Sequence, residues 1–296
     1  MNRKKASDFH PDVLKLFDQY VHGALDRRAF LQKAARYAVG GLTAAALLDS
    51  LKPNFAWAVQ VPESDERIAI SREKFSSPKG NGTIEGYLAL PAQGDGKLPA
   101  VVVYHENRGL NPYIEDVARR LAVEGYVAFA PDALTPLGGY PNDEDQARAM
   151  FAKLDQAKTH EDLFAAVDHV QAHPRYGGRY GAVGFCYGGG VVGKLAARRA
   201  DLDAAVPFYG PQPSADEAAR IQAPLLIHYA EHDERVNAGW PAFEETLKAN
   251  KVEYQAHFYP GTQHGFHNDT TPRYDEEAAE LAWRRTLEFF KQHLKG

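Results

Sequence analysis

From about residue 63 to the end of the chain, short apolar segments alternate with amphipathic ones, and this alternation constrains the fold more than any other feature. Residues 100–105 (A-V-V-V-Y-H) are apolar almost throughout, as expected of a strand buried on both faces of a sheet. The other predicted strands are 83–90, which alternates as an edge strand would, 126–131, 180–185, 204–208, 225–229 and 254–259. Helices are predicted at 114–124, 143–154, 161–173, 189–199, 241–250 and 275–294. This order predicts an α/β fold, with a mostly parallel, doubly wound sheet and helices on both faces.

The composition narrows the class of protein. The 296 residues are 44% hydrophobic and 25% charged, a mixture typical of globular proteins with one large domain or two small ones. The net charge of −5 argues against a general nucleic-acid binder and against a protein that binds anionic membranes. The single cysteine excludes a disulfide framework and a multi-cysteine zinc site.

The first 58 residues differ from the rest of the chain. They carry nine basic and five acidic side chains, a net charge of +4, whereas the remainder carries 25 basic and 34 acidic ones. The pair Arg27-Arg28 precedes an uncharged stretch at 37–48, and Ala56-Trp57-Ala58 follows it. This pattern resembles a twin-arginine export leader, which would place the mature protein in the periplasm. The twelve uncharged residues are too few for a membrane span, which needs about 20.

The alternative for this segment is a retained helical extension on a cytoplasmic protein. Apolar side chains recur there at helical spacing, at Val13, Leu14, Phe17 and Val21 and again from Phe30 onwards. The chain therefore divides into residues 1–58, a helical extension or leader, and residues 63–296, a catalytic domain. The extension is also a surface through which copies of the chain could form a homo-oligomer.

Residues 184–189 (G-F-C-Y-G-G) follow one predicted strand and open the next helix. This is the context of a nucleophile elbow, in which Cys186 occupies a strained turn and Gly184 and Gly188 leave room for the strand and the helix behind it. The N-terminus of the helix favours a thiolate. The alternative is a buried structural cysteine in a glycine-rich turn.

An elbow needs a base and an acid that orients the base, in the chain order nucleophile, acid, histidine. Asp233 follows Cys186 by 47 residues, and His264 follows Asp233 by 31 residues. Both come directly after predicted strands, at the edge where open α/β sheets bind ligands. The nearby competitors for these two roles are Glu231, Glu234 and His267.

Two loops are predicted to complete the site. In this fold the loop after 100–105 (H-E-N-R-G) supplies one backbone N–H of the oxyanion hole, here that of Asn107, and Tyr187 supplies the other. Two such donors stabilise a developing oxyanion by several kcal/mol. The proline- and glycine-rich segment 131–142 is predicted to lie over the site, and the alternative is a plain surface connection. The candidate substrate-binding side chains are Arg108, Tyr140 and Tyr209.

These motifs together resemble the dienelactone hydrolase (carboxymethylenebutenolidase) family of α/β-hydrolases, over about residues 65–295. The matching pieces are G-F-C-Y-G-G, H-E-N-R-G-L-N, F-A-P-D and Y-P-G-T-Q-H-G-F. The resemblance implies a small-molecule ester or lactone as substrate, no cofactor and no metal. It implies Cys186 as the nucleophile, Asp233 and His264 as its partners, and Glu106 as a carboxylate that contacts the resting thiol.

The sequence departs from the family in one respect and leaves two other functions open. Members that act on a carboxylated lactone place an arginine soon after the histidine, whereas residues 265–269 read G-F-H-N-D. The oxyanion loop instead carries Arg108, and Arg273 lies nearby in the sequence. A serine-hydrolase-like peptidase or acyltransferase and a catalytically silent scaffold are the alternatives. The H-x-x-E-H match at 228–232 gives no metal site, because in a strand its histidines would lie about 13 Å apart.

Overall fold

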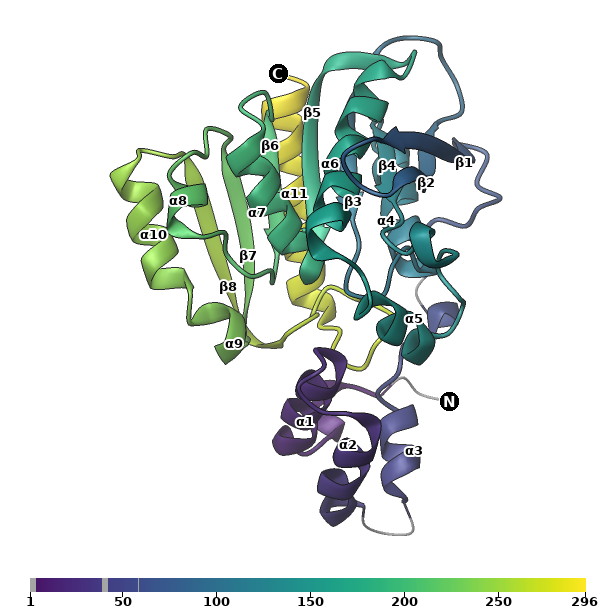
Figure 1. The fold of residues 1–296 in the computed structure, drawn as a ribbon, viewed down its shortest axis with the longest axis vertical. Coiled ribbons are helices and arrows are strands. Elements are labelled where there is room, and N and C mark those ends of the chain that lie inside the picture. Colours follow the sequence, from purple (N-terminus) through teal and green to yellow (C-terminus); the bar gives the residue numbers. More distant parts are fainter. Residues whose placement is uncertain (1–3, 39–41, 58) are drawn as a thin grey trace.

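The structure, a computed structural model, describes residues 4–38, 42–57 and 59–296. An eight-stranded sheet in the order β1-β2-β4-β3-β5-β6-β7-β8 forms its centre (Figure 1). The β1–β2 and β2–β4 pairs are antiparallel, and the other neighbouring strands are parallel. The strands are β1 (Ile68–Ser77), β2 (Gly82–Pro91), β3 (Leu98–Tyr104), β4 (Val127–Pro131), β5 (Tyr176–Phe185), β6 (Ala204–Phe208), β7 (Leu225–His232) and β8 (Tyr254–Gln263). The predicted mostly parallel α/β architecture is confirmed.

The prediction for the antiparallel end of the sheet was wrong. Segment 83–90 lies in β2, which pairs with both β1 and β4 and is therefore not the edge strand. The edge strand is β1, which the sequence analysis missed. Its sequence (I-A-I-S-R-E-K-F-S-S) is rich in charged and polar side chains, and most of them are at least partly exposed. An exposed edge strand lacks the apolar run that marks a buried one.

Helices cover both faces of the sheet (Figure 1). On one face, α4 (Pro112–Val123) and α11 (Glu276–Leu294) pack into one apolar cluster with β3, β5 and β6. On the other face, α6 (Gln156–Ala172), α7 (Tyr187–Arg198) and α10 (Trp240–Ala249) pack into a second cluster. The short helices are α5 (Glu144–Phe151), α8 (Ala215–Ala218) and α9 (Glu234–Asn237). The sheet is packed between the two apolar clusters, and the loops that carry the candidate site residues follow the ends of its strands.

The N-terminal segment forms three helices, α1 (Pro11–Val21), α2 (Arg27–Ala34) and α3 (Ala44–Asp49). They share an apolar cluster of their own, which includes the predicted buried face of α1. The helices pack beneath the C-terminal ends of the parallel strands, drawn in purple in Figure 1.

Three observations bear on the leader and on binding surfaces. Arg27 and Arg28 are exposed at the start of α2, while Ala58 and residues 39–41 lie outside the described residues, so the leader stays a prediction. In the described ranges, no helix combines the length and apolarity that a membrane crossing requires.

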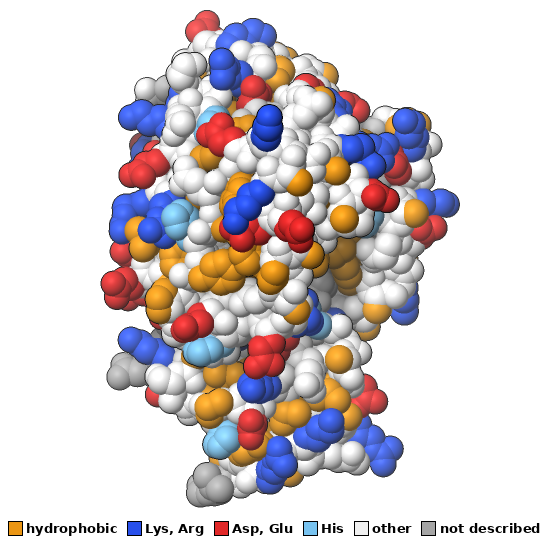
Figure 2. All heavy atoms as spheres, turned by 90° about the vertical axis from the view of Figure 1, so that its left-hand side faces the viewer, with side chains coloured by type: hydrophobic (Ala, Val, Ile, Leu, Met, Phe, Trp, Pro, Cys, Tyr) orange, Lys and Arg blue, Asp and Glu red, His pale blue; other side chains and the backbone are white. Residues whose placement is uncertain are grey.

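On the face in Figure 2, acidic and basic side chains are interspersed, without a large patch of one sign.

Candidate functional site

Cys186 lies in a strained turn between β5 and α7. Its backbone φ is +54°, in the region that ordinary side chains disfavour. Its two flanking glycines are sterically required. A Cβ on Gly184 would lie 2.1 Å from the carbonyl oxygen of Gly188, and a Cβ on Gly188 would lie 2.2 Å from that of Tyr104. The close approach of strand and helix therefore holds the sulfur at the end of the sheet.

Gly184→Ala should destabilise the protein by about 3 kcal/mol or more, because backbone atoms cannot move away as a flexible side chain can. Urea unfolding followed by circular dichroism measures the change. Gly96→Ala is the matched control. A Cβ on Gly96 meets nothing within 4 Å, so this variant should stay within about 0.5 kcal/mol of the wild type. Equal stability of the two variants would contradict the steric account of the elbow.

Asp233 and His264 meet because β7 and β8 run in parallel and end together. His232 is paired with Gln263 across these strands, so the next residue of each strand emerges at the same place. His264 Nδ1 lies 2.5 Å from Asp233 Oδ2, and both side chains are buried. The carboxylate thereby orients the imidazole and leaves its Nε2, which is also buried, without a hydrogen-bond partner.

The imidazole of His264 faces the sulfur of Cys186. The sulfur and one ring nitrogen of His264 lie within 4.8 Å of each other. Burial opposes ionisation of the thiol, but the positive charge of His264 lowers the pKa of Cys186 well below its usual value. Burial likewise opposes protonation of His264, yet the charges of Cys186 and Asp233 raise its pKa to about 10. These directions favour a thiolate–imidazolium pair.

The loop after β3 approaches the same sulfur. Glu106 is buried, and Asn268 Nδ2 donates a hydrogen bond of 2.8 Å to its Oε2. Burial, reinforced by the charge of Cys186, raises the pKa of Glu106. Asn107 is next in the chain, and its side chain donates to the carbonyl oxygen of Val21 in α1. Tyr187 is the first residue of α7, where a backbone N–H has no partner within the helix.

The three candidate substrate-binding side chains lie in two places. Arg108 is buried with its Nε 2.9 Å from Glu144 Oε2, and Tyr140 donates its hydroxyl proton to the other oxygen of the same carboxylate. Tyr209 is fully buried, and its ring packs at a steep angle against His264, with 5.1 Å between centroids. Tyr209 therefore packs against the imidazole of His264, whereas Arg108 and Tyr140 are both bound to the carboxylate of Glu144. All three roles stay predictions.

The alternative acids and histidine have other partners or face solvent. Glu231 is exposed and accepts a hydrogen bond from the backbone N–H of Gly261. Glu234 is exposed at the start of α9. His267 is buried, and its Nδ1 lies 2.7 Å from the hydroxyl of Tyr113. Among these candidates, the pair that meets in space is Asp233 and His264.

The structure adds a residue that the sequence analysis missed. His22, directly after α1, lies with its Nε2 3.4 Å from Cys186 Sγ, and its ring meets that of His264 edge-on at 4.8 Å between centroids. Its Nδ1 is 2.8 Å from the backbone oxygen of Asp18 and 3.1 Å from the carboxylate of the same residue. The apolar face of α1 indicates a docked helix, but nothing in the sequence indicates where it docks.

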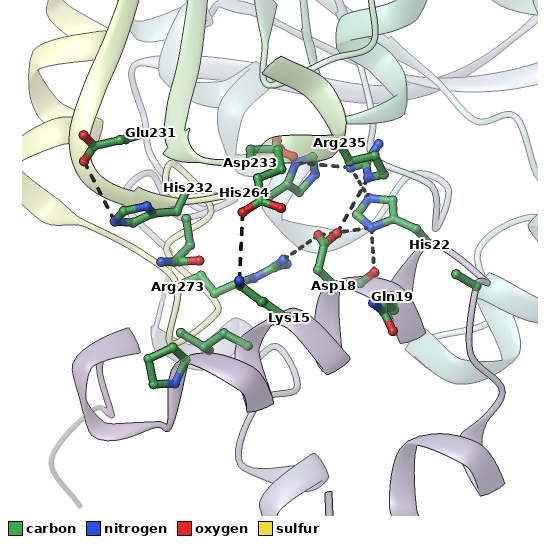
Figure 3. Close-up of a pocket in the computed structure, with 15 residues that line it drawn as sticks. Lys15, Asp18, Gln19, His22, Glu231, His232, Asp233, Arg235, His264 and Arg273 are labelled. Atoms are coloured by element: carbon green, nitrogen blue, oxygen red, sulfur yellow. Dashed lines mark hydrogen bonds and ion pairs between the residues drawn. The ribbon is translucent and has the colours of Figure 1, made fainter. Parts of the chain in front are cut away.

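A cavity of about 680 Å³ lies between α1 and the ends of β7 and β8 (Figure 3). Asp18 and His22 line it from α1, and Asp233 and His264 line it from the body. Two arginines surround Asp18. Arg235 Nε is 3.6 Å and Arg273 Nη1 is 3.8 Å from its carboxylate. Burial opposes ionisation of this carboxylate, but a hydrogen bond from His22 and the nearby positive charges lower its pKa.

Comparisons with known proteins identify the family. The family model described as dienelactone hydrolase family matches residues 84–294, and one described as YqhI-like matches residues 1–38. The "Putative hydrolase fragment YghX" of Escherichia coli K12 is 54% identical over 114 residues, which are 38% of this chain and 97% of that protein. A "Putative carboxymethylenebutenolidase" of the same strain is 34% identical over 250 residues, 79% of this chain and 90% of that protein.

Solved structures agree with this result. The crystal structure titled as a putative dienelactone hydrolase from Klebsiella pneumoniae superimposes with a TM-score of 0.67 at 30% identity, over 76% of this chain and 99% of that chain. The dienelactone hydrolase-like promiscuous phosphotriesterase P91 from metagenomic libraries gives 0.66 at 25% identity, over 77% and 99%. The resemblance inferred from the motifs is confirmed. This chain belongs to the dienelactone hydrolase family, α/β-hydrolases that cleave carboxylic ester or lactone bonds.

Proposed function

We propose that this hydrolase works through a Cys186–His264–Asp233 triad and a thioester intermediate. The observation that carries the proposal is the buried Asp233–His264 pair facing a cysteine in the elbow turn. A nucleophile, a base within reach of it and a group that orients the base are the three parts that covalent catalysis requires. Replacing the sulfur and following the hydrolysis of an aryl ester tests this proposal directly.

The first half of the reaction forms the thioester. The Cys186 thiolate attacks the carbonyl carbon, and the carbonyl electron pair moves onto its oxygen. The backbone N–H groups of Asn107 and Tyr187 stabilise that oxyanion. The protonated His264 then gives its Nε2 proton to the leaving alkoxide as the carbon–oxygen bond breaks, which releases an alcohol.

The second half regenerates the enzyme. Neutral His264 takes a proton from water, and the resulting hydroxide attacks the thioester carbon. The carbon–sulfur bond breaks, the carboxylic acid leaves, and the thiolate returns beside a protonated imidazole. Asp233 holds the ring in one tautomer throughout. Burial and the charge of Cys186 raise the pKa of Glu106, which Asn268 holds in place, and this favours a neutral carboxyl group that does not repel the thiolate.

The two arginines of the cavity support a substrate with a carboxylate of its own. Arg273 lines the cavity beside His264, and its buried Nε and Nη1 make no hydrogen bond within the described residues. Buried donors of this kind favour an anionic acceptor. Arg235, whose side chain is 42% exposed, stands at the other side of Asp18. We therefore propose Arg273 as the group that binds a substrate carboxylate, in place of the arginine missing from 265–269.

Arg273→Gln should raise the KM of a carboxylated aryl ester by about 10- to 100-fold, because a charged hydrogen bond contributes about 1.5 to 3 kcal/mol. The KM of the matched ester without a carboxylate should change little. Arg284→Gln, on the exposed surface of α11, is the control and should affect neither substrate. An equal loss on both esters would show that Arg273 supports the fold of the site and does not recognise the carboxylate.

A further inference from the structure

The sulfur of Cys186 lies within reach of two imidazoles, and the triad uses one of them. One ring nitrogen of His22, one of His264 and the sulfur lie within 4.8 Å of one another. In the described parts of the chain, no other three histidine, cysteine or acidic side chains converge in this way. The second imidazole comes from the N-terminal extension, so the cluster joins the two parts of the protein.

The spacing of the three groups suits a small divalent cation. Bond lengths of about 2.3 Å to sulfur and about 2.0 to 2.1 Å to nitrogen place the ligand atoms of a tetrahedral zinc site about 3.3 to 3.6 Å apart. The Nε2 of His22 already lies 3.4 Å from the sulfur. The remaining separations between the ligand atoms are at most 4.8 Å.

Each imidazole also has the outer partner that metal-binding histidines require. His264 Nδ1 is bound to the carboxylate of Asp233, and His22 Nδ1 is bound to the backbone oxygen of Asp18 at 2.8 Å, with the carboxylate of Asp18 3.1 Å away. A carboxylate on one ring nitrogen fixes the tautomer and turns the other nitrogen toward the metal. A hydrolase triad needs one histidine held through its Nδ1, and this site has two.

The Nε2 atoms of both histidines face the cluster. His264 Nε2 is buried and has no hydrogen-bond partner. Arg235 Nη2 lies 3.1 Å from His22 Nε2, and since a guanidinium can only donate, that nitrogen presents a lone pair. Arg235 is 42% exposed and can turn into solvent when a cation takes its place.

The donor set selects the class of ion. One thiolate and two imidazoles favour borderline-soft cations such as Zn²⁺ over Ca²⁺ and Mg²⁺, which prefer oxygen. Three protein ligands leave a fourth position for water, and the cavity beside the two histidines gives access to it. The carboxylates of Asp18 and Asp233 offset the added positive charge.

We propose that Cys186, His264 and His22 bind one Zn²⁺, and that the bound ion reversibly blocks hydrolysis. Binding displaces the Nε2 proton of the His264 imidazolium into solvent, so the sulfur lone pair that attacks the carbonyl and the nitrogen that carries the proton both become metal ligands. The ion also ties α1 to the body. The block on hydrolysis rests on the proposed triad, whereas the binding of the ion does not.

The test titrates Co²⁺, as a spectroscopic substitute for Zn²⁺, into the full chain after treatment with a chelator. One equivalent should bind and give a thiolate-to-cobalt charge-transfer band with the strong visible bands of tetrahedral cobalt. Zn²⁺ should displace it and abolish aryl ester hydrolysis, and a chelator should restore the activity. Binding that leaves hydrolysis unchanged would overturn the block, and absence of a thiolate band would overturn the site.

Two variants separate this site from the triad. His22→Gln removes a ligand and should weaken Zn²⁺ binding by more than about 100-fold, because loss of an outer carboxylate alone costs about 10- to 100-fold. Asp18→Asn should show that smaller loss. His232→Gln, which changes an exposed histidine of the same cavity, is the control and should bind Zn²⁺ as the wild type does. Equal affinity in the His22 and His232 variants would overturn the site, even if Cys186 proves essential for hydrolysis.

Discussion

Cys186→Ala should lower kcat/KM for small aryl esters by at least about 10⁴-fold, because no other side chain in the elbow can form the covalent intermediate. The residual rate would come from the oxyanion hole and from binding alone. Steady-state kinetics on freshly reduced protein measure the effect. Circular dichroism should show an unchanged fold, since the substitution removes one buried atom at the edge of the core.

Alkylation provides an independent check of the same sulfur. The chain has a single cysteine, so the mass added by iodoacetamide reports on Cys186 alone. Loss of activity should follow the extent of alkylation at neutral pH, as expected of a thiolate. Turnover of the alanine variant at the wild-type rate would remove the cysteine from the chemistry. A folded protein whose thiol does not react would favour the silent scaffold.

Asp233→Asn should lower kcat by about 10³- to 10⁴-fold while leaving the fold intact. The carboxylate accepts a hydrogen bond from His264 Nδ1 at 2.5 Å, and this fixes the tautomer that presents a basic Nε2 to the sulfur. An amide in its place can donate to Nδ1 and stabilise the opposite tautomer. Steady-state assays of ester hydrolysis measure the decrease in kcat.

The matched control for this variant is Glu231→Gln. Glu231 precedes Asp233 by two residues, and the sequence cannot distinguish the two acids by composition or by spacing. Its side chain faces solvent and binds the backbone of Gly261, so kcat should stay within about twofold of the wild type. A larger loss of kcat in the Glu231 variant than in the Asp233 variant would show that Glu231, and not Asp233, is the acid of the triad.

The central sheet could be predicted because its strands are buried on both faces. Segments such as 100–105 and 204–208 are continuous apolar runs with few alternative structures. The antiparallel end could not be predicted in the same way, because β1 faces solvent and carries charges. Pairing with β2, a contact between neighbouring chain segments, stabilises β1 and leaves no apolar pattern in its sequence.

The place of Cys186 in a strained turn could be predicted for a local reason, whereas the contacts around it depend on tertiary structure. The turn at 184–189 determines its own geometry, because its glycines meet backbone atoms of adjacent elements. The choice of Asp233 over its neighbours depends on the register between β7 and β8, which is a tertiary property. His22 lies 164 residues before the cysteine, and only the docking of α1 brings the two together.

Because α1 covers Cys186, the presence or absence of the N-terminal helices would change the site. If the twin-arginine pattern is used and cleavage follows Ala58, the export machinery removes His22 and Asp18 together with the helix that bears them. The full-length chain would have a site covered by α1, with two histidines near the sulfur. The processed chain would have an uncovered site with one histidine, and Arg273 would lack its ion-pair partner Asp18. The two forms of the chain would then differ in what lies over the sulfur and in the charge beside it.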